Sequence, residues 1–247
     1  MSRQNTHKGE GHRQRLRERF LAAGLDGFHD YEVVELLLSL GTPRKDCKDI
    51  AKAVMQRFGT LQRVFSASVN ELCEVDGIGP NNVFGIRLMP AVAERYLRER
   101  VAQSDPLNNA ASLYAYLYQS MSHKDREHFR VLFLDAKNHV LASEVLFEGT
   151  LTAGAVYPRE VVKKALDHRA AAVIFAHNHP SGDPEPSEAD VAITRRLVFA
   201  CMNVGITVHE HLVIGDRRYF SFADAGHIAR MTRQYEHDVS KYTGAGA

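Results

Sequence analysis

Residues 171–190 constrain the local fold of this chain more tightly than any other segment. The apolar run at 171–176, rich in β-branched and aromatic side chains, is typical of a buried strand that ends near His177. Prolines and glycines between 180 and 186 then exclude regular structure. Ser187 follows as a helix N-cap, with Asp190 in the first helical turn. The segment is therefore predicted to leave a strand, turn, and enter a helix with Asp190 facing back.

Three potential metal ligands lie within this segment: His177, His179 and Asp190. Side chains at i and i+2 of an extended backbone point to one side, so the two histidines can approach one ion. Two imidazoles and one carboxylate leave a fourth tetrahedral position for water, as in a catalytic Zn²⁺ site. Taken singly, the signals are weak, because a His-x-His pair is common and Ser187 with Asp190 can be only a capping box. Their combination across the loop favours zinc.

The same residues resemble a known family. The order of His, His, Pro, Ser and Asp over residues 177–190 is similar to the JAMM motif of MPN-type metallohydrolases. The run His-Asn-His-Pro-Ser-Gly-Asp-Pro from 177, with Tyr-Pro-Arg-Glu at 157–160, more closely resembles the bacterial RadC family. The resemblance spans most of residues 10–230. It implies a small helical domain with a helix-hairpin-helix element, followed by a three-layer, cytidine-deaminase-like α/β MPN domain that carries the metal.

The sequence pattern also divides the chain into a helical domain and an α/β domain. Residues 1–102 are expected to form the helical domain, 108–232 the MPN/JAMM domain, and 233–247 a tail. The polar, proline-bearing stretch 101–109 is the best linker candidate.

In the second half, strands alternate with helices, which favours an α/β or α+β fold. The expected elements are a helix at 111–121, strands at 129–134, 140–147 and 151–156, a helix from Pro158, a helix at 188–202, and strands at 206–208 and 211–214.

The first half contains helical patterns and a candidate helix-hairpin-helix at 75–80, whose glycines would let backbone amides meet a phosphate. The hairpin departs from the nucleic-acid-binding pattern, since Pro80, Asn81 and Asn82 stand where a cation would help. Pro90 is expected to interrupt the helix that follows. A structural or protein-docking role is therefore favoured over DNA contact.

An arginine cluster near the amino terminus has two possible roles. Arg13, Arg15, Arg17 and Arg19 alternate with other residues just before an apolar pair. They can form a solvated helix face or contact phosphates.

The chemistry of such a site needs a carboxylate that does not bind the metal, to take a proton from zinc-bound water. The resemblance implies that this base is Glu127, just ahead of the strand at 129–134. Glu144, on the next strand, is the second choice, and Glu127 can also be a surface partner of Arg126 or Lys124. For Ser187, the resemblance implies an oxyanion contact in addition to its capping role.

Two further features near the motif are less specific. Asn178, between the histidine ligands, is expected to face away from the metal and serve the loop structure. The run His209, Glu210, His211 differs from the RadC pattern, in which Asp-His stands at the last two positions. The role of this pair is left open between support of a ligand and an ordinary partly buried histidine.

Composition limits the compartment and the partners. The net charge is +1, and residues 1–105 hold 16 Lys and Arg against 14 Asp and Glu, so neither half has a charge excess that predicts nucleic-acid binding. The three cysteines are isolated, which indicates a reducing compartment. No signal peptide or membrane span is evident, so a cytoplasmic protein is expected.

Two functions follow as hypotheses. The first is a zinc-dependent metallopeptidase or isopeptidase-like hydrolase acting on a peptide or protein. The second is a DNA-repair or DNA-processing accessory protein that binds DNA weakly through its helix-hairpin-helix domain and keeps a structural or vestigial metal. The oligomeric state is left open.

Overall fold

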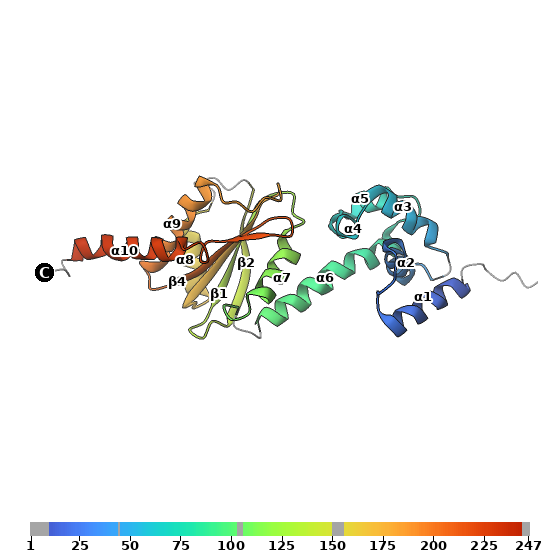
Figure 1. Cartoon of the computed structure of the whole chain (residues 1–247), viewed down its shortest axis with the longest axis horizontal. Coiled ribbons are helices and arrows are strands. Elements are labelled where there is room, and N and C mark those ends of the chain that lie inside the picture. Colours follow the sequence, from blue (N-terminus) through green and yellow to red (C-terminus); the bar gives the residue numbers. More distant parts are fainter. Residues whose placement is uncertain (1–9, 44, 103–105, 150–155, 244–247) are drawn as a thin grey trace, which may run out of the picture. The chain divides into compact units, whose positions relative to one another are not determined.

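The computed structural model describes residues 10–43, 45–102, 106–149 and 156–243. The chain divides into two compact units, Met1–Ala93 and Glu94–Ala247. The first unit is helical (Figure 1). Its elements are α1 (Glu10–Ala23), α2 (Asp30–Gly41), α3 (Lys48–Phe58), α4 (Leu61–Ser66), α5 (Val69–Cys73) and the first part of α6 (Pro80–Ala102).

Helices α2, α3 and α6 of the first unit bury a shared apolar core that includes Val34, Leu38, Val54 and Ile86. Helices α2 and α6 approach closely through glycine. A Cβ added at Gly85 would lie 2.2 Å from the carbonyl oxygen of Leu37. Only a residue without a side chain permits this contact between backbones.

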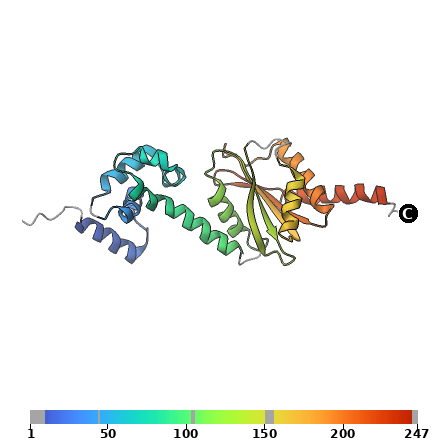
Figure 2. The same ribbon diagram turned by 180° about the vertical axis from the view of Figure 1, so that it is seen from behind.

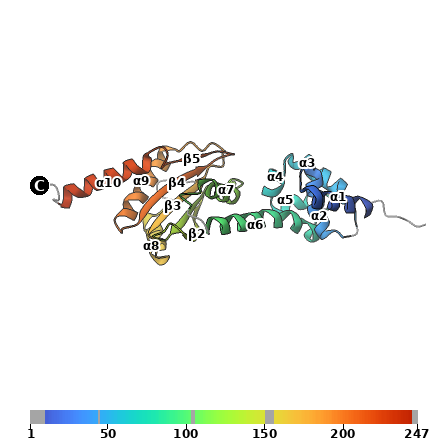
Figure 3. The same ribbon diagram turned by 60° about the horizontal axis from the view of Figure 1, so that its bottom comes forward.

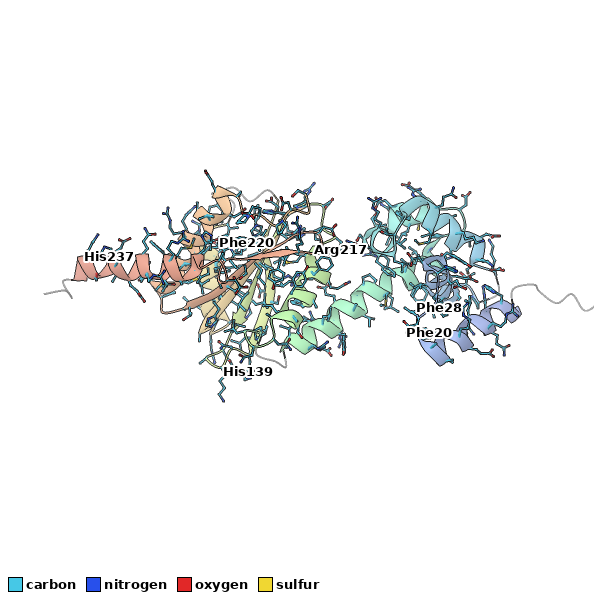
Figure 4. The ribbon with its side chains drawn as sticks, in the orientation of Figure 1. Phe20, Phe28, His139, Arg217, Phe220 and His237 are labelled. Atoms are coloured by element: carbon cyan, nitrogen blue, oxygen red, sulfur yellow. The ribbon has the colours of Figure 1, made fainter. Side chains whose placement is uncertain are left out.

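The arginine cluster of α1 is divided between side chains that contact other parts of the unit and side chains that lie exposed on the helix. Arg19 forms an ion pair with Glu32 at 2.8 Å and lies over the ring of Phe28, a residue labelled in Figure 4. The guanidinium of Arg13 contacts the sulfur of Cys47. Arg15 and Arg17 are exposed. Two of the four arginines thus hold α1 to the rest of the unit.

Helix α6 differs from the expectation in two ways. It runs through Pro90 as one helix, although a proline was expected to interrupt it. The boundary between the units falls inside it, earlier than the predicted linker at 101–109. Leu97 and Val101, on its last turns, pack into the apolar core of the second unit. Burial of both ends of α6 offsets the missing hydrogen bond of the proline.

The second unit is a five-stranded mixed sheet with helices on both faces, which confirms the predicted α/β class. The strand order is β2-β1-β3-β4-β5; β3 and β4 are parallel and the other neighbours antiparallel. The strands are β1 (His128–Leu134), β2 (Val140–Glu148), β3 (Ala172–Asn178), β4 (Thr207–Ile214) and β5 (Tyr219–Ser221). Figure 3 shows them as a twisted fan. The helices are α7 (Ala110–Met121), α8 (Pro158–Asp167), α9 (Glu188–Met202) and α10 (His227–Thr243).

Each face of the sheet carries its own core. Alternate residues of β1 point to opposite faces, so that Phe129 and Phe133 join the core beneath α8, α9 and α10. Leu132 and Leu134 join the core beneath α7. The view from behind shows α8 and α9 covering the face opposite α7 (Figure 2). Every residue of β3 is buried, as expected for a central strand covered on both faces.

Several boundaries differ from the expected ones. Of the strand expected at 151–156, residues 151–155 lie outside the described part of the chain. Helix α10 continues to Thr243, so the segment expected as a tail begins inside a helix. None of the helices in the described residues is long and apolar enough to cross a membrane.

The strands expected at 206–208 and 211–214 form one continuous strand, β4, with an irregularity. Its pairing with β3 moves from Val208 directly to Glu210, so His209 is an extra residue in the ladder. Such a β-bulge reverses the alternation of side chains beyond it. His211 therefore points to the same face as Phe175, its partner on β3, and thus toward His177.

Candidate metal centre

The structure brings together the three side chains that the sequence predicts as ligands. Their ligand atoms all lie within 4.8 Å of one another. Nε2 of His177 lies 3.0 Å from Nε2 of His179 and 3.3 Å from Oδ1 of Asp190. Nε2 of His179 lies 3.4 Å from Oδ2 of Asp190. Strand β3 supplies His177, His179 follows directly after the strand, and the first turn of α9 supplies the carboxylate.

These separations fit a tetrahedral zinc ion. Ligand atoms at about 2.0–2.1 Å from such an ion lie roughly 3.3 Å apart along each edge of the tetrahedron. The three distances between ligand atoms are close to that edge length. The two histidine distances to Asp190 end on different oxygens of its carboxylate, so one carboxylate oxygen and two imidazole nitrogens would occupy three positions around such an ion, which leaves the fourth for a solvent molecule or a substrate oxygen.

A buried chain of hydrogen bonds fixes the ring of His177. Its Nδ1 lies 2.8 Å from Nε2 of His211, and Nδ1 of His211 lies 2.6 Å from the hydroxyl oxygen of Thr194. The Thr194 hydroxyl donates to the backbone carbonyl of Asp190 at 2.5 Å. Because that donation commits the only hydroxyl proton, His211 donates to Thr194 and His177 donates to His211. Nε2 of His177 is then the unprotonated nitrogen that a metal requires.

His179 is oriented independently. Its Nδ1 lies 2.8 Å from the carbonyl oxygen of Asp183 in the Pro/Gly loop, and a carbonyl can only accept. Nδ1 therefore carries the proton and Nε2 faces the other ligands. The loop in turn contacts the β4–β5 hairpin, because the amide of Asp216 donates to the carbonyl of Gly182. Arg217, the next residue of this hairpin, is exposed and is labelled in Figure 4.

Asp190 is both part of a helix cap and a candidate ligand. Its Oδ2 accepts from the amide of Ser187 at 2.8 Å and from the Ser187 hydroxyl at 2.6 Å. Burial would raise the pKa of Asp190, but hydrogen bonds with the two histidines and with Ser187 hold it well below its ordinary value. The carboxylate is therefore ionised, as a metal ligand must be.

The pKa values of the two candidate histidine ligands shift in opposite directions. Burial lowers the pKa of His177, which favours the neutral ring. The hydrogen bond with Asp190 raises the pKa of His179, with a smaller contribution in the same direction from the charge of Glu127. The charge of Glu127 also contributes to raising the pKa of His177, against the larger effect of burial. These effects place its carboxylate within electrostatic reach of both imidazoles.

Glu127 is held beside the ligand strand by a side chain between the two histidines. The Asn178 side chain is buried and faces the loop at 124–128 rather than the ligands, as expected from the sequence. Glu127 is half-buried in that loop, and its carbonyl accepts from Gly149 at 2.8 Å. The loop is thus tied to the end of β3, beside the candidate metal ligands His177 and His179.

The other candidates lie elsewhere or act indirectly. Glu144, the second choice for the base, pairs with Lys164 at 2.8 Å and His168 at 2.6 Å against α8. His211 hydrogen-bonds to His177, a candidate ligand, whereas the Glu210 carboxylate accepts from Ser221 at the end of β5 and from Ala223 just after it.

Sequence reasoning did not single out Thr194. The one available signal was its position four residues after Asp190, on the same side of α9.

Comparison with known proteins finds family models and relatives that this chain resembles. Residues 107–227 match the family model described as a RadC-like JAB domain, and residues 11–84 match the model described as UPF0758 N-terminal. A UPF0758 protein of Ruegeria pomeroyi is 42% identical over 217 residues, covering 88% of this chain and 97% of the relative. A UPF0758 protein of Rhodobacter capsulatus is 44% identical over 211 residues, covering 85% of this chain and 99% of the relative.

The hydrogen-bond chain behind His177 predicts an effect of Thr194→Val on zinc affinity. Valine keeps the shape of threonine but leaves Nδ1 of His211 without an acceptor, which loosens the orientation of His177. We expect zinc affinity, measured by competition with a chelator, to fall about 10- to 100-fold. Thr207→Val, at the exposed start of β4, is the matched control and should change nothing. Equal affinity in the Thr194 variant and the wild type would show that the chain does not support the site.

Proposed function

Because this chain belongs to the UPF0758 family and contains its RadC-like JAB domain, we propose that it is a zinc-dependent hydrolase of peptide or isopeptide bonds. The observation that carries the proposal is the convergence of two imidazoles and one carboxylate on a position that leaves one ligand place free. A second carboxylate, that of Glu127, lies within electrostatic reach without belonging to the ligand set.

The residues have separate tasks in this reaction. When bound, zinc lowers the pKa of its water ligand toward neutrality and polarises the substrate carbonyl. His177, His179 and Asp190 hold the ion. Glu127 accepts the proton of the attacking water and passes it to the leaving amine. His211 and Thr194 keep Nε2 of His177 unprotonated and correctly aimed.

Ser187 is the proposed donor to the oxyanion, but its hydroxyl proton first has another partner. In the structure it donates to Oδ2 of Asp190. The hydroxyl can reach a substrate oxygen only after turning away from Asp190. Binding of a cation would favour that turn, because the cation neutralises the carboxylate that now attracts the proton. Ser187 therefore has a capping role at rest and an oxyanion role only with metal and substrate present.

The proposal predicts a selective loss of turnover in Glu127→Gln. Glutamine keeps the shape of glutamate but cannot accept the proton. We expect cleavage of a peptide library to fall at least about 100-fold while zinc content stays at the wild-type value. Glu185→Gln, which changes an exposed carboxylate in the Pro/Gly loop, is the control and should cleave normally. Unchanged cleavage by the Glu127 variant would remove this residue from the mechanism.

A second candidate function is DNA binding by the first unit. A pocket lies at the hairpin before α6 and is lined by residues that include Gly77, Gly79 and Lys45. The positive φ of Gly77 makes the hairpin tight, and Lys45 supplies a cation for a phosphate. One feature weakens this candidate. The amide of Gly79 already donates to the side chain of Asn82 at 2.8 Å.

DNA binding predicts a measurable salt dependence. In a titration of the full chain with duplex DNA, Lys45→Ala should weaken binding uniformly across sequences and reduce the salt slope by about one. Lys137→Ala, which removes an exposed cation of the second unit, should have no effect. The candidate fails if the wild type binds no DNA at low ionic strength.

A further inference from the structure

The side chain of Asn178 joins the two parts of the candidate site. It lies between the two histidine ligands at the end of β3 and is 1% exposed. Its Oδ1 accepts from the amide of His128 at 2.8 Å. Its Nδ2 donates to the carbonyl of Arg126 at 3.0 Å and, more weakly, to that of Lys124 at 3.4 Å. All three hydrogen bonds therefore end on the segment 124–128.

These contacts enclose Glu127. The carbonyl before it and the amide after it both bind the same Asn178 side chain. Its own carbonyl accepts from the amide of Gly149, which follows β2. The backbone of Glu127 is thus held from both sides, so its side chain leaves from a fixed point.

We propose that Asn178 is a positioning residue that holds the segment bearing Glu127 at a set distance from the metal ligands. This inference rests on the proposed hydrolase function only for its consequence for turnover. The mechanical part, fixation of 124–128 by Asn178, stands on the hydrogen bonds alone. A general base must lie within hydrogen-bonding reach of the attacking water, and a displacement of about 1 Å can reduce the rate 100-fold.

The alternative is that Asn178 only ends the β1–β3 ladder. The last paired residues of that ladder are Phe129 and His177, and the bond from the His128 amide to Asn178 extends it by one step. A role in ending the β1–β3 ladder explains that bond. It does not account for the two bonds from Nδ2, which go to the carbonyls of Arg126 and Lys124 before the strand begins. An amide side chain suits this position because it combines an acceptor oxygen with an NH₂ group that donates to two carbonyls.

The test compares Asn178→Ala and Asn178→Asp with the wild type in the full chain. Alanine removes all three hydrogen bonds. Aspartate keeps the acceptor for His128 but loses both amide donors, which tests the contacts that a role in ending the ladder does not need. Asn203→Asp is the matched control, because the Asn203 amide also accepts one hydrogen bond, from Tyr235, and donates another, to Phe199, at the far end of α9.

Three quantities are measured in each protein: zinc content, hydrogen–deuterium exchange over residues 122–130, and the kcat and KM of any peptide that the wild type cleaves. We expect both Asn178 variants to keep zinc and to exchange at least about tenfold faster in this segment. Where cleavage is observed, kcat should fall at least about tenfold while KM stays within about twofold. Asn203→Asp should match the wild type in all three.

Several results would overturn the proposal. Unchanged exchange over 122–130 would show that Asn178 does not hold the segment, and an unchanged kcat would show that holding it is irrelevant to turnover. Loss of zinc together with activity would mean that Asn178 acts on the ligands instead. Unfolding of both variants would assign it a purely structural role. If the wild type cleaves no peptide, the hydrolase proposal fails, and the exchange measurement alone then decides the role of Asn178.

Discussion

The buried imidazole of His177 is the interaction on which the rest of the candidate site depends. Its ring has no exposed surface, and the two ring nitrogens face different neighbours. Nδ1 faces His211, and Nε2 faces His179 and Asp190. A buried polar ring without such partners would be costly. The register in which the sheet and α9 meet gives Nδ1 a hydrogen-bond partner and aims the unprotonated Nε2 at the candidate metal position, where a cation would be its partner.

The first two turns of helix α9 make three separate contributions to this arrangement: a cap, a carboxylate and a carbonyl. The capping box joins Ser187 to Asp190, which fixes where the helix begins. The Asp190 carboxylate faces the histidines, while its carbonyl accepts from Thr194 and so closes the chain from His211. A single helix start thus positions the carboxylate of Asp190 and sets the tautomer of His177, two of the three candidate ligands. Changes at this helix start should affect stability and metal binding together.

The sequence predicts the parts of the site that are local. Residues 171–190 contain their own signals for strand, loop and helix, so the proximity of His177, His179 and Asp190 follows from spacing alone. The features that depend on distant segments were not predictable in this way. The bulge at His209 turns His211 toward His177, and it appears only in the pairing of β3 with β4. The contacts from Asn178 to residues 124–128 join segments about fifty residues apart.

The fold shows the same division between local and distant information. Helix α9 has the predicted bounds, because both a cap and an apolar pattern mark it. The continuity of α6 through Pro90 and the unit boundary inside it depend on tertiary packing of Leu97 and Val101, which no local pattern reveals. Glu127 was identified through resemblance to a family. Its electrostatic effect on the histidines depends on the pairing of β1 with β3, which brings the start of β1 beside the end of β3.

X-ray absorption spectroscopy at the zinc edge tests the central claim most directly, when combined with metal analysis of the wild type and of Asp190→Asn. The account predicts one zinc per wild-type chain, four nitrogen or oxygen ligands at about 2.0–2.1 Å including two imidazoles, and one ligand that exchanges with added anions. The Asp190 variant should lose most of its zinc. A wild type that binds no zinc, or a variant that keeps full zinc with an unchanged spectrum, would contradict it.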